Sequence, residues 1–98
     1  MEKMIEAIIA RCEEVATMFY QNKVTEGFGI LCMLIEDIQV LMKDVSEKEE
    51  LLEKNAENLM RLNEVLADAL NAMQENDKVL LADIVKYDVI EQLKQIEV

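Results

Sequence analysis

The stretch Val24 to Val45, VTEGFGILCMLIEDIQVLMKDV, decides the fold. On a helix its apolar residues recur at alternating spacings of four and three, which is the seam pattern of packed helices. The seam residues are Val24, Phe28, Leu31, Ile35, Ile38, Met42 and Val45. Ile30, Leu34 and Leu41 widen the apolar arc to roughly 160°, beyond the ~100° stripe of an ordinary surface helix. Such a helix needs cover from more than one neighbour, so the sequence predicts a helical bundle around it.

The composition is typical of an all-α protein. The chain has 98 residues, of which 52% are hydrophobic and 32% charged, and it contains no proline to interrupt helices. Glu, Leu, Lys, Met and Ala, which favour helices, dominate the sequence. A chain of this length forms one domain by the usual size of domains. We therefore expect residues 1–98 to be a single helical-bundle domain.

Acidic residues outnumber basic residues by 21 to 10, and the resulting net charge of −11 is spread over every segment. An acidic surface opposes binding to phosphate backbones and to anionic membranes. We therefore expect neither nucleic acid nor a membrane as a partner. The charge suits a soluble cytosolic protein, and it would also steer a basic protein partner toward the surface.

The sequence predicts a cytoplasmic location. The first residues, MEKMIEAIIARCEEV, mix charged and apolar residues at helical period, unlike a signal peptide. No apolar run approaches the roughly 18 residues of a membrane span. Cys12 and Cys32 lack the spacing of a paired motif. We expect both thiols to be reduced, with Cys12 in the core.

The periodicity predicts four helices joined by three short breaks. The expected ranges are 2–20, 23–45, 47–75 and 78–96. Asn22 and Asp77 are expected to cap the second and fourth helices, and Ser46 with Glu49 has the pattern of a capping box for the third. Short connections make successive helices antiparallel neighbours, so the predicted fold is an up-down-up-down four-helix bundle.

Three positions stand out within these helices. Gly27 projects onto the apolar side, and a glycine costs a helix interior about 1 kcal/mol against alanine. We therefore expect Gly27 to permit close approach of another backbone. Gly29 projects onto the opposite side, without a packing reason. Asn55 interrupts the apolar stripe of the third helix, where it either fixes register from a buried position or marks a stripe end that reaches solvent.

The fourth helix has two apolar faces. The first consists of Leu81, Val85, Val89, Leu93 and Ile96, and the second of Leu80, Ile84 and Tyr87. The first can pack in the bundle, and the second then needs cover of its own, because an exposed apolar patch on a small protein marks an interface. Met33 and Met60 fall outside the main stripes, and methionine is common at surfaces that accept varied partners.

The sequence indicates no enzyme chemistry. It contains no histidine, which removes Ser/His and Cys/His nucleophilic sites, the usual zinc sites and di-iron Glu-x-x-His motifs. Neither an EF-hand loop nor a phosphate-binding glycine loop occurs. Glu36 lies nearer to Cys32 than Lys43 does, so the local field does not activate that thiol. We predict no catalytic residue, no cofactor and no metal, and we expect a non-enzymatic protein.

Two segments carry a resemblance to a known family. The segment AIIARCEEVATMFYQNKVTEGFGILCMLIEDIQVLM resembles the middle of bacterial flagellar export chaperones of the flagellin-binding type, with a helix, a polar turn at 20–23 and a second helix. The ending NDKVLLADIVKYDVIEQLKQI is similar to their C-terminal helix. The tyrosine-rich N-terminal segment of that family is absent, and no functional residue carries over. The chain equally resembles small, uncharacterised helical proteins of anaerobic Firmicutes.

These patterns predict a small acidic adaptor or chaperone-like protein that binds a helical segment of a partner protein in an apolar groove. The residues expected to contact the partner are Leu80, Ile84, Tyr87, Met60 and Met33. The alternative is a self-associating structural bundle, in which the same apolar surface is buried in a homodimer.

Overall fold

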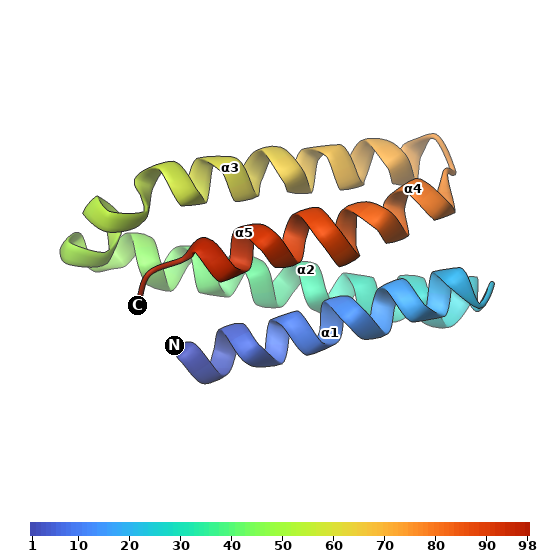
Figure 1. Ribbon diagram of the computed structural model, residues 1–98, viewed down its shortest axis with the longest axis horizontal. Helices are drawn as coiled ribbons and strands as arrows, with labels where there is room; N and C mark the ends of the chain where they lie inside the picture. Colours follow the sequence, from blue (N-terminus) through green and yellow to red (C-terminus); the bar gives the residue numbers. More distant parts are fainter.

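The computed structural model describes residues 1–98 and contains four antiparallel helices and no strand (Figure 1). The elements are α1 (Glu2–Tyr20), α2 (Val24–Glu47), α3 (Glu49–Gln74), α4 (Lys78–Asp83), η1 (Ile84–Val89) and α5 (Ile90–Gln95). The last three are consecutive pieces of one helix, which we call the last helix. The chain runs up, down, up and down, so that both termini lie at the end of the bundle where α2 meets α3 (Figure 1). The predicted all-α four-helix bundle is confirmed.

The core runs along the bundle axis and takes side chains from all four helices. The contribution of α2, as its wide apolar arc predicts, runs along most of its length: Leu31, Leu34, Ile38, Leu41 and Val45. Cys12 of α1 is fully buried, as predicted, whereas Cys32 is exposed. Burial raises the pKa of the Cys12 thiol to about 12, with a further contribution from the charge of Glu13. Cys12 therefore behaves as a small apolar side chain.

Gly27 lies where α2 packs closely against α1. A Cβ added there would lie 3.2 Å from two ring atoms of Phe19 and 3.4 Å from the Cβ of Met18. The same ring packs edge-on against Phe28, with ring centroids 5.0 Å apart. Close packing of α1 at Gly27 is confirmed, but the nearest atoms belong to the side chains of Phe19 and Met18 and not to another backbone. A Cβ at Gly29 would meet nothing within 4 Å, so this glycine has no packing role.

Two of the breaks contain asparagines in the left-handed conformation. Asn22 has a φ of 61° and Asn76 a φ of 57°, values that asparagine tolerates better than most residues. Asn22 therefore ends α1, and the prediction that it caps α2 is wrong, because the N-cap of α2 is Lys23 and makes no side-chain hydrogen bond. The predicted cap at Asp77 is confirmed, since its carboxylate accepts a hydrogen bond from the Leu80 N–H at 3.0 Å.

The break between α2 and α3 differs from its prediction. The helix α2 continues through Ser46 to Glu47, and the Ser46 hydroxyl donates to the Lys43 carbonyl at 2.9 Å. After the extended residue Lys48, α3 begins at Glu49 without a side-chain cap. The predicted capping box is therefore wrong, because its serine belongs to the preceding helix.

The last helix is not a regular α-helix, because η1 is π-helical. Four of its buried residues follow three successive spacings of four: Leu81, Val85, Val89 and Leu93. At about 100° per residue, each such step drifts by about 40° around an α-helix. A π-helix bonds residue i to i+5 and so holds more residues in each turn, which compensates for the drift. Ile84 is also buried, at 7% exposure, and the prediction that it belongs to an exposed second face is wrong.

Asn55 is fully buried in α3 and holds the C-terminal end of the chain. Its side-chain oxygen accepts from the Glu97 N–H at 2.8 Å, and its amide donates to the Glu97 carbonyl at 2.8 Å and to the Leu51 carbonyl at 2.9 Å. The neighbouring Asn58 donates to the Gln95 carbonyl at 3.0 Å. These contacts satisfy backbone groups at a helix end that lack intrahelical partners. Asn55 is therefore buried and not at a stripe end that reaches solvent, and its role in fixing register stays a prediction.

Candidate binding groove

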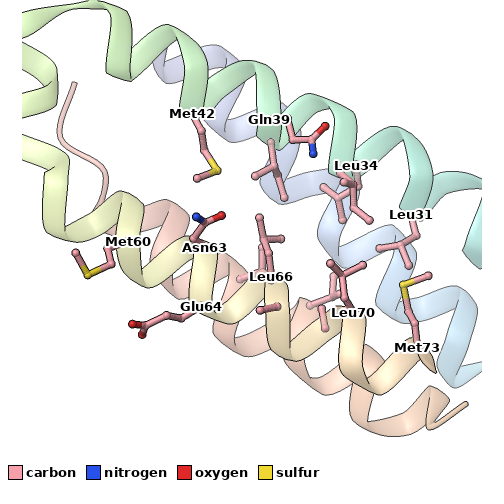
Figure 2. A pocket seen from close by; sticks show the side chains of 16 residues that line it. Leu31, Leu34, Gln39, Met42, Met60, Asn63, Glu64, Leu66, Leu70 and Met73 are labelled. Atoms are coloured by element: carbon pink, nitrogen blue, oxygen red, sulfur yellow. The ribbon is translucent and has the colours of Figure 1, made fainter. Parts of the chain in front are cut away.

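An apolar groove lies between α2 and α3, and Figure 2 shows it from close by. These helices are adjacent in the chain, yet they approach each other less closely than the other neighbouring pairs of the bundle. The space between them has a volume of about 500 Å³, within the ~300–1,000 Å³ range of ligand sites. We call it the α2–α3 groove.

Sixteen residues line the α2–α3 groove, and thirteen of them are hydrophobic. The wall on α2 consists of Leu31, Leu34, Ile35, Ile38, Gln39 and Met42. The wall on α3 consists of Met60, Asn63, Glu64, Leu66, Ala67, Ala69, Leu70 and Met73. Val85 and Val89 of η1 close its inner side. The π-helical segment thus supplies the base of the groove.

The wide apolar arc of α2 explains why this helix forms a wall. One part of the arc packs on α1, and a second part faces the centre of the bundle, where Leu34 and Ile38 are buried. The part that faces α3 is covered incompletely, and Ile35 and Met42 remain half-buried. In Figure 2, Met42 and Leu31 of α2 point toward Asn63 and Met73 of α3 across the open space, whereas Met60 and Glu64 point away from α2.

The groove opens to solvent along α3. Its inner residues, such as Leu34 and Val89, are almost completely buried, whereas Leu70 is 48% exposed and Met60 is 63% exposed. Large apolar side chains remain exposed beside an open cavity. Covering this apolar surface would lower the free energy of the system. The open side of the groove therefore presents apolar surface to solvent.

Three methionines line the groove: Met42 on α2 and Met60 and Met73 on α3. The methionine side chain is unbranched and polarizable, so it adapts its shape to different apolar neighbours. The groove is therefore suited to a ligand surface that varies in detail.

The polar lining of the groove consists of Gln39, Asn63 and Glu64, all of which are exposed. These side chains can make hydrogen bonds with a bound molecule at the rim. No group of three or more Cys, Asp or Glu side chains in the structure is arranged to hold a metal ion. The chemistry of the groove is therefore that of binding an apolar surface with a polar edge.

The two helices that form the groove carry most of the net charge. Five acidic and one basic residue lie on α2, and six acidic and two basic residues lie on α3, so together they contribute −8 of the net −11. Two of the three basic residues already contact carboxylates of the same helix, Arg61 with Glu57 at 2.7 Å and Lys43 with Glu47 at 3.8 Å. Asp37 of α2 is also paired, with Arg11 of α1 at 2.8 Å, and Glu64 is the charged residue on the groove lining itself.

The structure does not bring the five predicted contact residues together. Met60 lines the groove, and Met33 is exposed on α2 outside the groove lining. Leu80 and Tyr87 are exposed on the last helix, and Ile84 is buried in the core. Sequence reasoning assigned most of the other groove residues to the core.

Tyr87 belongs to a polar cluster that joins the end of α1 to η1. The Tyr20 hydroxyl donates a hydrogen bond to the Asp83 carboxylate, and Lys86 Nζ lies 5.7 Å from the centroid of the Tyr20 ring and 5.4 Å from that of Tyr87. The hydrogen bond to Asp83 raises the pKa of Tyr20 to about 12, with smaller contributions from desolvation and neighbouring charges. The contact with Lys86 therefore gives Tyr87 a structural role between η1 and the end of α1.

The fold and the groove define an all-α four-helix bundle protein with one open apolar seam. A family described as "Domain of unknown function (DUF8042)" matches residues 1–98, and the chain belongs to this family. Neither a curated protein nor a solved structure matches it. None of its helices combines the length and the apolar character needed to cross a bilayer. The resemblance to flagellar export chaperones stays a prediction.

Proposed function

We propose that the protein is a non-enzymatic adaptor that binds a helical segment of a partner protein in the α2–α3 groove. The observation that supports this proposal is the apolar seam that the chain leaves uncovered, with Leu70 and Met60 exposed beside a cavity of about 500 Å³. A groove between two helices is a recognised site for an amphipathic helix, which lays its apolar face between the walls.

The dimensions of the groove support a helical ligand. Its wall on α2 extends from Leu31 to Met42, and its wall on α3 from Met60 to Met73. At 1.5 Å per residue these walls are about 16 Å and 20 Å long, which matches a helix of three to four turns. A helix lying there would contact both walls, as a further helix of the bundle would. We place this activity in the cytosol, where the free thiols Cys12 and Cys32 would stay reduced.

A second candidate is a homodimer with a structural role. The exposed side chains of Val79 and Leu80 at the start of the last helix favour it, because self-association would cover them. Pairing two α2–α3 grooves, by contrast, would bring the two most acidic faces together. We therefore prefer the adaptor.

Photo-crosslinking in the native host tests this proposal. Benzoylphenylalanine replaces Ala67, which is exposed and lines the groove, and in a control it replaces Glu14, which is exposed on α1 outside the groove. We expect a crosslinked partner from position 67 alone, with the crosslinked peptide mapping to an amphipathic helical segment. Crosslinks between copies of the chain would support the homodimer instead. Equal crosslinking from both positions, or none from position 67, would contradict the adaptor.

A further inference from the structure

The charge around the α2–α3 groove indicates what kind of helix it accepts. We propose that its occupant is a basic amphipathic helix of a partner protein, with a row of apolar side chains flanked by Lys and Arg. This inference rests on the proposed function and adds the chemistry of the partner.

The electrostatic argument begins with the walls. The two helices that form them contribute −8 of the net −11, and Glu64 is the charged residue on the lining itself. A ligand whose apolar face enters the groove presents its flanks to these carboxylates. Cationic flanks would be attracted and would speed the encounter, whereas anionic flanks would be repelled. The surface therefore selects among amphipathic helices by the sign of their charge.

The same argument weighs against other occupants. A second copy of the chain carries the same −11 charge, and its most acidic helices would meet those of the first. A fatty acid that placed its carboxylate beside Glu64 would be repelled by that side chain. A cationic helix suits both the apolar walls and the Glu64 carboxylate.

The groove also constrains the apolar row of the ligand. A segment that follows the walls from Leu31 to Met42 and from Met60 to Met73 has a bound length of about 11–14 residues. Apolar side chains spaced three and four residues apart would then fall on one face and enter the groove together. The three lining methionines would adapt to Leu, Ile, Phe or Met at these positions.

Three synthetic peptides of about 14 residues separate charge from pattern. The first has Leu at one helical face and Lys elsewhere, the second replaces every Lys with Glu, and the third keeps the composition of the first but scatters Leu around the helix. Fluorescence anisotropy measures their affinity for the whole protein at about 50 mM and 500 mM salt. We expect the first to bind at least about tenfold more tightly than either of the others, and to weaken as salt rises.

Two charge-matched variants locate the effect. Glu64→Lys and Glu14→Lys change the net charge equally, but only Glu64 lies on the groove lining. We expect Glu64→Lys to weaken binding of the first peptide by roughly three- to tenfold and Glu14→Lys to have a much smaller effect, because close charges interact most strongly. Circular dichroism confirms that both variants remain folded.

The outcomes distinguish the two proposals. Equal binding of the Lys and Glu peptides would overturn the basic partner and leave the adaptor standing, as would a neutral or acidic segment crosslinked at position 67. Equal binding of the first and third peptides would show nonspecific attraction and would overturn the proposed helix recognition. Equal effects of Glu64→Lys and Glu14→Lys would overturn the groove as the site of charge selection. Absence of binding by all three, with no crosslinked partner, would contradict both proposals.

Discussion

Replacing Asn55 with alanine should destabilise the protein although the apolar core stays intact. The substitution removes one side-chain acceptor and one donor group, which together bond the Glu97 N–H, the Glu97 carbonyl and the Leu51 carbonyl at 2.8–2.9 Å. A hydrogen bond contributes about 1 kcal/mol net, and a buried polar group left without a partner costs about 1–3 kcal/mol. Water can reach Glu97, which is exposed, so the unpaired groups there cost less than that.

We therefore expect Asn55→Ala to lower the free energy of unfolding by about 2–4 kcal/mol, out of a total of about 5–15 kcal/mol for a domain. Urea unfolding followed by circular dichroism measures this loss. Amide hydrogen exchange at Glu97 should accelerate in the variant more than exchange in the middle of α1, because the perturbation begins at the C-terminal end.

The matched control is Asn58→Ala. Asn58 is half-buried and donates to the Gln95 carbonyl at 3.0 Å and to the Asn55 side-chain oxygen at 3.2 Å. Because water can replace these bonds at a half-buried position, its loss should cost only about 1 kcal/mol. A cost below about 0.5 kcal/mol for Asn55→Ala, or equal costs for the two variants, would refute the idea that Asn55 holds the chain end.

Three further outcomes follow from the packing and the titrating groups. Gly29→Ala should raise the free energy of unfolding by about 1 kcal/mol. The Gly27→Ala variant should be about 1–2 kcal/mol less stable than the Gly29→Ala variant, because its methyl group meets an aromatic ring of α1. Equal unfolding midpoints for the two variants would contradict this. Cys32 should react with a thiol reagent at once, and Cys12 should react only when the protein unfolds. Rapid labelling of two thiols per chain in native buffer would show that Cys12 is not enclosed. Because the folded state raises the pKa values of Cys12 and Tyr20 to about 12, their stabilising contribution is complete below pH 9 and is lost as pH rises toward 12. Unfolding curves that do not change between pH 9 and 11.5 would contradict those shifts.

Much of the bundle could be predicted from α2. Its apolar arc is too wide for one neighbour, and the three breaks are too short for anything but antiparallel packing. Gly27 shows how far such reasoning extends, because a helix-weakening residue on a packed face implies a close contact. The partner in that contact, Phe19, was not predictable, because the relative rotation of α1 and α2 depends on the packing of many side chains together.

The helix ends were harder to predict for a chemical reason. Asparagine can cap the start of a helix and can also adopt the left-handed conformation that ends one. At Asn22 both possibilities fit the sequence, and the second occurs. Similarly, Ser46 fits a capping box in sequence. In the structure α2 continues through Ser46 to Glu47, so Ser46 does not cap α3.

The groove could not be predicted, because apolar stripes do not reveal the distance between two helices. Leu66, Leu70 and Met73 fit a core stripe as well as a groove wall. Met60 falls outside the stripes in the sequence, and the structure places it on the groove wall, exposed to solvent. The π-helical segment had a sequence signal, the repeated spacing of four from Leu81 to Leu93, which a regular α-helix cannot keep on one side.

Methyl NMR of the protein labelled at methionine, titrated with the basic amphipathic peptide, most directly tests whether the α2–α3 groove binds a helix. The methyl signals of Met42, Met60 and Met73 report on the groove, and that of Met33, exposed on α2 outside the lining, is an internal control. We predict saturable shifts of the three groove signals with little change at Met33. Shifts at Met33 of equal size, or groove signals that respond only to the concentration of the protein itself, would contradict a helix-binding groove.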